Sequence, residues 1–283
     1  MLLSSLKRLR LYVSGNKSAP MSDNIKYNRM LTQWLAITSN QVEEWLNRTI
    51  LIAERTEYFD VTRDRNEYRP LAFPITEIDS VKSDITGLFD GGETTESDYF
   101  IGAQSRSIVL ESSFYWTSER GLKIVYTGGM AYHGTQSTFA TTKPAASPTV
   151  GKYAHGQSSG ACAVVVSFAS EVLILDNYYG VFQASEVVKF YDDEDLETEQ
   201  TTMELTISSI TKQSLAEAYP AIVGAVETQV RYYWTHAVDF ENSSTGKDGT
   251  TTRKMTLGMK STRPIPLLPE TYNMLQPFRR IEF

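Results

Sequence analysis

The stretch from Tyr219 to Phe240 constrains the fold most, because its apolar residues recur at every third or fourth position. This spacing gathers them on one face of an α-helix. Pro220 suits a first helical turn, and the polar, glycine-containing run 241–252 ends the pattern. Burying such a face stabilises by on the order of 10 kcal/mol, and ordering the same residues costs at least as much. The predicted helix therefore needs a second layer from the rest of the chain.

A second amphipathic segment, residues 25–48, is the natural partner of that helix. Ser22 and Asp23 can cap its start, and the polar run Thr38 to Asn40 predicts a kink or a break within it. We expect the two helices to pack face to face. The residues predicted to form the helix-bundle core are Leu31, Trp34, Leu35, Trp45, Leu46, Ile222, Val226, Val230, Tyr233 and Trp234.

Two regions are rich in short β-type runs separated by turn signals. The first predicts a small antiparallel subdomain, with strands at 57–61, 75–82, 99–102, 107–110 and 122–126. Residues 131–150 are rich in Thr, Ser, Ala and Pro, and we interpret them as a linker. The second region predicts an inserted all-β module, with strands at 161–168, 172–175, 181–182, 187–190 and 203–210.

The expected fold class is α+β. It combines a helical bundle of two main helices with the small antiparallel β-subdomain, the inserted all-β module and an extended C-terminal tail. Residues 1–130 and 217–252 form the two parts of the main domain, 144–211 the module and 253–283 the tail. Prolines and widely spaced apolar side chains mark that tail, so we expect it to fray or to dock on a partner rather than to join the core.

Composition excludes several classes of protein. The net charge of −7 and the pI near 5.2 argue against nucleic-acid binding as the main role. Cys162 is the only cysteine, which excludes a disulfide framework and a cysteine zinc site. The sequence contains no apolar run long enough to predict a membrane-spanning helix. Its N-terminus is basic and apolar but lacks the pattern of a secretion signal. These features fit folding in the cytosol.

Side chains that carry catalysis are sparse. His133, His155 and His236 are the only histidines, and none stands at a metal-ligand spacing or beside a nucleophile signature. The first two lie in glycine-rich stretches that we interpret as turns. The acidic run 192–199 lacks the spacing of a calcium loop, and Gly246-Lys247 lacks the remainder of a phosphate loop. We therefore expect no enzyme, no cofactor and no metal site, and a solvated acidic hairpin or linker at 192–199.

A series of short motifs follows one order along the chain. It runs through Leu31-Thr32-Gln33-Trp34-Leu35 to Asn47-Arg48, Glu57-Tyr58-Phe59-Asp60, Leu71-Ala72-Phe73-Pro74-Ile75, Ile124-Val125-Tyr126-Thr127-Gly128-Gly129, Tyr219-Pro220 and the closing segment 267–280. In this order the motifs resemble the phage head–tail connector family, the adaptor or head-completion proteins that sit under the portal. The stretch 156–186 is similar to a small β-module recurrent in tailed-phage virion proteins, which the usual family member lacks.

The resemblance implies a structural virion protein at the head–tail interface, synthesised in the host cytoplasm. It would be a head-to-tail adaptor forming a ring of roughly twelve copies under the portal vertex, through heterologous contacts made by the exposed side of the two-helix layer. The implied partners are the portal, further copies of this chain, and a downstream tail, nozzle or stopper protein. DNA would pass through the channel without sequence-specific binding, and no membrane is involved.

The same resemblance assigns portal docking to the tail. The residues expected to dock are Leu268, Tyr272, Leu275, Phe278, Arg279 and Arg280. An alternative function is a peripheral virion binding protein, whose β-insert recognises a capsid, tail-fibre or host-surface partner. A phage-encoded enzyme is a third class, and it would require a bound metal or nucleotide.

Overall fold

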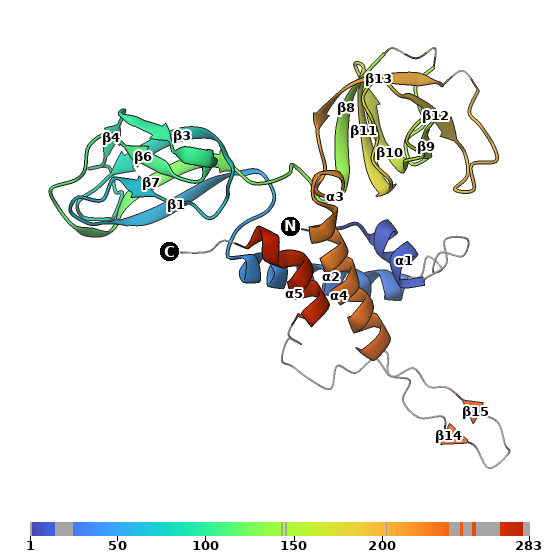
Figure 1. Cartoon of the computed structure of the whole chain (residues 1–283), viewed down its shortest axis with the longest axis horizontal. Coiled ribbons are helices and arrows are strands. Elements are labelled where there is room, and N and C mark those ends of the chain that lie inside the picture. Colours follow the sequence, from blue (N-terminus) through green and yellow to red (C-terminus); the bar gives the residue numbers. More distant parts are fainter. Residues whose placement is uncertain are drawn as a thin grey trace. The chain divides into compact units, whose positions relative to one another are not determined.

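The computed structural model describes residues 2–14, 25–142, 144, 146–201, 203–237, 244–245, 251–252 and 267–279. The chain divides into two compact units (Figure 1). Unit 1 comprises Met1–Leu46 and Gly134–Arg279, and unit 2 comprises Asn47–His133 and Arg280–Phe283. Unit 1 contains a helical layer and a β-barrel, whereas unit 2 is built from two small sheets.

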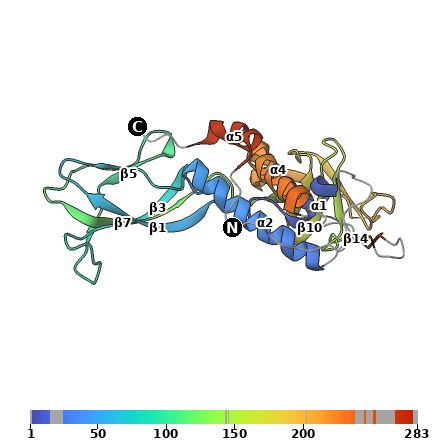
Figure 2. The same ribbon diagram turned by 90° about the horizontal axis from the view of Figure 1, so that it is seen from below.

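The helical layer of unit 1 is centred on α4 (Pro220–Ala237). This helix is contacted by α1 (Leu6–Ser14), α2 (Ile25–Leu46), α3 (Leu215–Ala218) and α5 (Pro269–Leu275), as Figure 2 shows for α1, α2 and α5. Ser214 caps α3, because its side chain accepts a hydrogen bond from the backbone N–H of Glu217. A short 3₁₀ turn, η2 (Gln276–Phe278), follows α5.

The kink predicted at Thr38 to Asn40 does not occur, because α2 runs unbroken through these residues. Thr38 and Ser39 are fully buried. The Ser39 hydroxyl accepts a hydrogen bond of 3.2 Å from the backbone N–H of Leu3, just before α1. A polar side chain inside the helix thus satisfies a buried donor of another segment, which explains why polarity here does not break the helix.

The barrel of unit 1 is closed. Its six strands are β8 (Gln136–Thr141), β9 (Tyr153–Gly156), β10 (Cys162–Ala169), β11 (Val172–Tyr179), β12 (Val187–Tyr191) and β13 (Leu205–Lys212). They follow the cyclic order β10-β11-β8-β13-β12-β9. Alternate residues point inward, as the pattern of burial along β8 shows. The core is filled by large side chains such as Phe139, Phe182 and Phe190.

Unit 2 pairs a four-stranded sheet with a three-stranded one. The first has the order β1-β7-β3-β4 and the second the order β2-β6-β5. Their bounds are β1 Ala53–Val61, β2 Glu67–Tyr68, β3 Ile75–Ser83, β4 Thr94–Glu96, β5 Tyr99–Ile101, β6 Ile108–Leu110 and β7 Ser118–Gly128, with the 3₁₀ turn η1 at Ala103–Ser105. Tyr68, Ile108 and Leu122 lie at the centre of the core. A two-stranded pair, β14 (Ser244–Thr245) and β15 (Thr251–Thr252), completes the described elements.

The predicted fold class is wrong. More of the described residues lie in strands than in helices, and the largest single element is the closed barrel rather than a helical bundle. The main cause is residues 131–150, which we interpreted as a linker but which contain β8. Ser137, Phe139 and Thr141 form its inward face, so a composition typical of linkers concealed the period-two alternation of a central barrel strand. Residues 181–182, predicted as a strand, lie outside the named strands.

The expectation of an extended C-terminal tail is also wrong for residues 267–279. Leu267, Thr271 and Leu275 are spaced by four, and all three are buried. This spacing is typical of one face of a helix, and α5 packs that face on α4. The proline at the first helical position starts the helix rather than preventing it.

Candidate interaction surface

Three of the motifs that are separate in the sequence meet at Tyr126 in unit 2. The Tyr126 hydroxyl accepts a hydrogen bond of 3.1 Å from the backbone N–H of Ala72 and donates one to the carboxylate of Glu57. The backbone N–H of Leu71 donates to the same carboxylate at 3.1 Å. Burial and the contact with Glu57 raise the pKa of Tyr126, so this hydroxyl stays protonated as the donor.

A fourth motif joins the same site through Arg48. Its guanidinium lies over the Phe73 ring at 3.4 Å from the centroid and donates a hydrogen bond to the Phe73 carbonyl. Two glycines allow the strands to approach closely. A Cβ on Gly128 would lie 2.5 Å from the Ala72 carbonyl oxygen, and Gly129 has a φ of 139°. Tyr126, Gly128 and Gly129 are thus structural requirements of this junction.

The structure places most of the predicted helix-bundle core inside unit 1. The fully or almost fully buried members are Leu31, Trp34, Leu35, Leu46, Ile222, Val226, Val230 and Tyr233. Trp45 and Trp234 are half-buried. Trp34 contacts Tyr233 and Trp234, with ring centroids 6.4 and 6.1 Å apart, which joins α2 to α4.

The predicted docking residues of the C-terminal segment contact the helical layer of their own chain. Leu275 is fully buried, and Tyr272 packs on Trp45 with centroids 5.2 Å apart. Phe278 meets Tyr219 edge to face, and the Arg279 guanidinium lies over Trp45. Leu268 is half-buried, and Arg280 lies outside the described residues.

Gln229 on α4 anchors this segment. Its side chain is fully buried, and its carbonyl oxygen accepts a hydrogen bond of 2.9 Å from the backbone N–H of Leu268. The Thr271 hydroxyl lies 3.4 Å from the same oxygen. The start of α5 is therefore fixed to α4 by a buried amide, which the hydrophobic pattern of α4 alone does not reveal.

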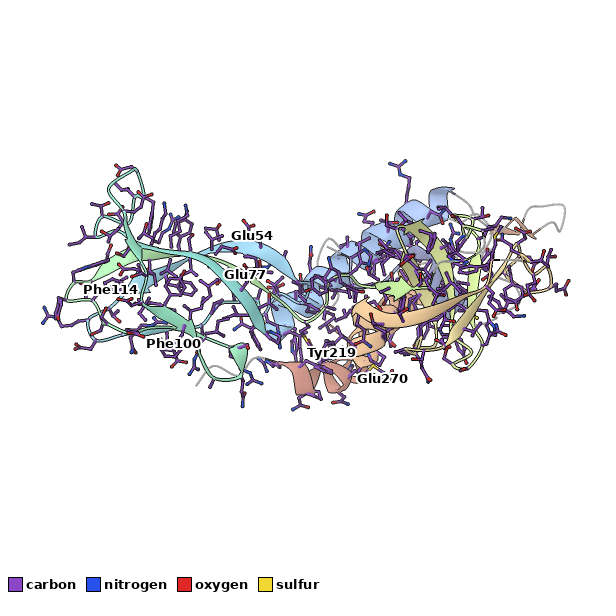
Figure 3. All side chains as sticks on the ribbon, turned by 90° about the horizontal axis from the view of Figure 1, so that it is seen from above. Glu54, Glu77, Phe100, Phe114, Tyr219 and Glu270 are labelled. Atoms are coloured by element: carbon purple, nitrogen blue, oxygen red, sulfur yellow. The ribbon has the colours of Figure 1, made fainter. Side chains whose placement is uncertain are left out.

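One end of unit 2 exposes large apolar side chains on an ordered loop. Ile85 is 63% exposed and Leu88 is 71% exposed, both in the loop between β3 and β4. On the neighbouring loop between β6 and β7, Tyr115 is 90% exposed. We call Ile85, Leu88, Tyr115 and the adjacent Arg120 the tip. In Figure 3, Phe114 marks this end of the unit and Glu77 the opposite end.

The Asp84 carboxylate holds the loop of the tip in shape. It accepts hydrogen bonds from the backbone N–H groups of Thr86 at 2.8 Å and Phe89 at 2.7 Å, and these bonds hold its pKa below the ordinary value. The Asp84 backbone N–H donates to the Gly121 carbonyl at 2.9 Å. Gly87 has a φ of 69°, and a Cβ there would lie 2.4 Å from the carbonyl oxygen of Glu119. The exposed side chains therefore stand on a preorganised support.

A basic side chain stands beside the apolar ones. The Arg120 guanidinium lies over the Tyr58 ring at 4.5 Å from the centroid, and Tyr58 in turn packs against Phe89. Arg120 itself is exposed. Aromatic residues and arginine are enriched in protein interfaces, and exposed apolar patches on an ordered surface mark sites of interaction.

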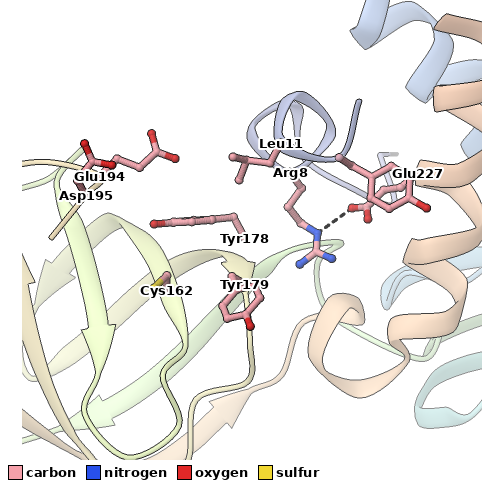
Figure 4. A pocket seen from close by; sticks show the side chains of 9 residues that line it. Arg8, Leu11, Cys162, Tyr178, Tyr179, Glu194, Asp195 and Glu227 are labelled. Atoms are coloured by element: carbon pink, nitrogen blue, oxygen red, sulfur yellow. Dashed lines mark hydrogen bonds and ion pairs between the residues drawn. The ribbon is translucent and has the colours of Figure 1, made fainter. Parts of the chain in front are cut away.

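Unit 1 has a cleft between α1, α4 and the barrel (Figure 4). It has a volume of about 520 Å³ and is mainly apolar. Its lining residues are Arg8, Leu11, Tyr12, Cys162, Tyr178, Tyr179, Glu194, Asp195 and Glu227. The Arg8 Nε atom donates to Glu227 at 2.8 Å, which neutralises this pair, and the Ser4 hydroxyl donates to the same carboxylate at 2.7 Å.

Charges at the other wall of the cleft come from the acidic run 192–199. The ammonium of Lys7 lies over the rings of Tyr153 and Tyr178, at 4.0 and 4.5 Å from their centroids. Burial lowers the pKa of Lys7, while the nearby carboxylate of Glu194 opposes that shift. Burial raises the pKa of Tyr178. Asp195 remains exposed at the edge of the cleft.

The barrel is joined to the helices through a buried carboxylate. Glu217 on α3 accepts hydrogen bonds from the Ser137 hydroxyl of β8 and, at 3.0 Å, from the Asn177 amide of β11. Burial raises the pKa of Glu217, and these two hydrogen bonds work against the shift. This network did not follow from the sequence, because the strand that carries Ser137 lies within residues 131–150, whose composition is typical of a linker.

The described residues contain no group of His, Cys, Asp and Glu side chains placed to hold a metal ion. His155 lies in strand β9 rather than in the predicted turn, with its ring against Tyr191. His133 is exposed, and Gly246-Lys247 lies outside the described residues. None of the helices in the described ranges has the length and hydropathy needed to cross a bilayer.

Among known proteins, only solved structures show a likeness to this chain. No family model and no curated protein matches the chain. Among solved structures, it is similar to a chain from the neck of an empty GTA particle computed with C6 symmetry. The two share 8% identity with a TM-score of 0.45, over 100% of this chain and 96% of the other. A likeness this weak carries no argument about function.

Proposed function

We propose that this protein is a structural virion protein that acts as a head-to-tail adaptor, forming a ring under the portal vertex. The observation that carries the proposal is the site around Tyr126. Motifs that resemble the connector family at four separate places in the sequence contribute Arg48, Glu57, Ala72 and Tyr126 to one hydrogen-bonded junction.

The distribution of surfaces supports the same proposal. Unit 2 presents an ordered apolar tip, and unit 1 presents an apolar cleft with acidic edges. Both are features of a protein that assembles with other proteins. The proposed partners are further copies of this chain, the portal and the next protein of the tail. The number of copies follows the symmetry of the portal, for which we propose roughly twelve.

Because the C-terminal segment packs on its own chain, we modify its proposed role in portal docking. Leu275 is part of the core of unit 1, so it is not available as an anchor while α5 is in place. Arg279 is exposed, and Tyr272 and Phe278 are half-buried. In our proposal the portal therefore contacts the outer side of the docked segment.

Inactivation of the gene in the parent virus tests this function. An adaptor is needed after the head is packaged and before the tail joins, so the expected products are tailless heads and separate, complete tails. Electron microscopy of the lysate would show them. Complementation with the intact gene should restore tailed particles. Normal tailed particles without this protein would contradict the adaptor role.

A barrel with its own closed core favours a second candidate function. The twelve-residue core of the barrel is separate from the helical layer, which suits a module added at the outside of a particle to bind a capsid, tail-fibre or host-surface partner. In that case virions whose protein lacks the barrel would assemble normally but would lose the peripheral partner.

A further inference from the structure

The tip and the cleft have complementary properties. The tip projects aliphatic and aromatic side chains from a fixed loop, with one arginine beside them. The cleft is lined by Leu11, Tyr12 and two tyrosines of β11, and its volume lies within the range of about 300–1,000 Å³ that is typical of binding pockets. We propose that the tip of one copy of this chain inserts into the cleft of a second copy.

The charges at the two surfaces favour this pairing over a contact between like surfaces. Arg120 has no ion pair among the described residues, and its guanidinium is already oriented by stacking on Tyr58. Asp195 is exposed at the edge of the cleft, on the side formed by the acidic run. Two tips placed against each other would bring two Arg120 side chains together, and two clefts would bring two Asp195 carboxylates together.

Preorganisation lowers the cost of the contact. The Asp84 carboxylate and the positive-φ Gly87 fix the loop that carries Ile85 and Leu88. Insertion therefore orders little backbone that is not already ordered, and most of the buried apolar area contributes to binding. The cleft is likewise bounded by a barrel strand and two helices rather than by a loop alone.

The geometry is heterologous, because each copy offers one tip and one cleft. Such a contact repeats from copy to copy and closes a ring when the rotation between neighbours allows it. The contact itself rests on the described surfaces, and only the closure into a ring rests on the proposed function. The tip–cleft contact replaces the contact between copies that we expected from the exposed side of the helical layer. In that layer α4 is covered by four other helices, and the exposed residues of α2 are polar, such as Gln33 and Glu44.

Cross-linking through the native cysteine tests the contact. Cys162 lines the cleft, and Leu88→Cys adds a second thiol at the tip, where 71% exposure makes the substitution compatible with folding. A short bismaleimide should join the tip of one copy to the cleft of the next. Because each copy carries one of each thiol, denaturing gels should show a ladder of dimers, trimers and larger products.

Two control variants test whether the cross-linked ladder requires both Cys162 and a thiol at the tip. Leu88→Cys combined with Cys162→Ser should abolish it, and Glu77→Cys, at the opposite end of unit 2, should not produce it. Dimers that persist without Cys162 would indicate a tip-to-tip contact and would overturn the proposal. The absence of any cross-linked product at about 1 mM protein would also overturn it, because even a contact with a Kd of about 1 mM would be substantially populated at that concentration.

A charge reversal tests the orientation. In the Leu88→Cys background, Asp195→Arg should reduce the ladder about tenfold or more, because it places a second cation against Arg120. Glu197→Arg, a matched reversal in the same acidic run but outside the cleft, should leave the ladder unchanged. Equal effects of the two reversals would overturn the proposed site.

Mixing two defective variants separates this inference from the proposed function. A copy with Ile85→Ser and Leu88→Ser keeps its cleft, and a copy with Asp195→Arg keeps its tip. Together they retain one intact contact, so native mass spectrometry should find a one-to-one dimer that does not grow. No dimer would overturn the tip–cleft contact. This readout needs no portal, so it can succeed even if the adaptor role fails.

Discussion

At the scale of single residues, a few polar side chains hold loops, strands and helices of each unit in place. Tyr126 connects β7 to β1 and to the segment before β3 through its hydroxyl. Asp84 organises the loop of the tip, and Glu217 joins the barrel to α3. Tyr126 and Glu217 each bond groups from separate segments, so the loss of either side chain leaves buried groups unpaired. The Asp84 carboxylate instead bonds two backbone N–H groups of its own loop.

Tyr126→Phe should lower the free energy of unfolding of unit 2 by about 1–3 kcal/mol, because it leaves the Ala72 N–H and the Glu57 carboxylate without their shared partner. Urea titration followed by circular dichroism measures this change. Tyr115→Phe is the matched control, since that ring is 90% exposed and its hydroxyl faces solvent. Equal stability of the two variants would show that the Tyr126 hydroxyl has no such role.

Asp84→Asn should loosen the loop of the tip without unfolding unit 2. Because the pKa of Asp84 is below its ordinary value, its contribution is present above pH 3.8 and is lost as the pH falls through the pKa of the folded state. NMR should therefore show the amide signals of Thr86 and Phe89 moving together at low pH in the native protein. In the variant they should already be shifted at neutral pH. Unchanged signals would contradict the assignment.

At the scale of elements, α4 and β8 are the two on which unit 1 depends. α4 receives the other four helices, and β8 pairs with both β11 and β13 in the barrel. The periodicity of residues 219–240 predicted α4 closely, and residues 75–82 predicted β3 to within one residue. β8 was not predicted, because its small polar residues are buried by neighbouring strands and by Glu217. Amino-acid composition alone does not show such tertiary contacts.

Gln229→Leu should release α5 from α4. The substitution removes the acceptor of the Leu268 N–H while keeping a side chain of similar length, and the cost is about 1–3 kcal/mol for the unpaired group. Hydrogen exchange should then be faster across residues 267–279 and unchanged in the barrel. Asn273→Ala, on the exposed side of α5, is the control and should have little effect. Equal exchange in both variants would refute the anchoring role.

At the scale of the whole molecule, the sequence predicted the two main helices and most of the β-rich stretches, but not β8, α5 or the way in which the segments combine. The Trp34 and Tyr233 contact followed from helical spacing, whereas the docking of Leu275 on the same layer did not. Proline residues made the C-terminal segment look extended, although Leu267, Thr271 and Leu275 have helical spacing. The buried amide of Gln229, together with that apolar face, explains the position of the segment on α4. The tip and the cleft likewise depend on loops and strands that meet only in the folded chain.

The proposed adaptor role requires this chain to assemble in many copies at a portal. Native mass spectrometry of the purified protein, alone and mixed with the portal of the same virus, tests it most directly. The expected result is a complex in which the number of copies matches the symmetry of the portal ring, with weaker assembly when the portal is absent. A chain that ignores the portal and keeps a fixed mass of its own would contradict it.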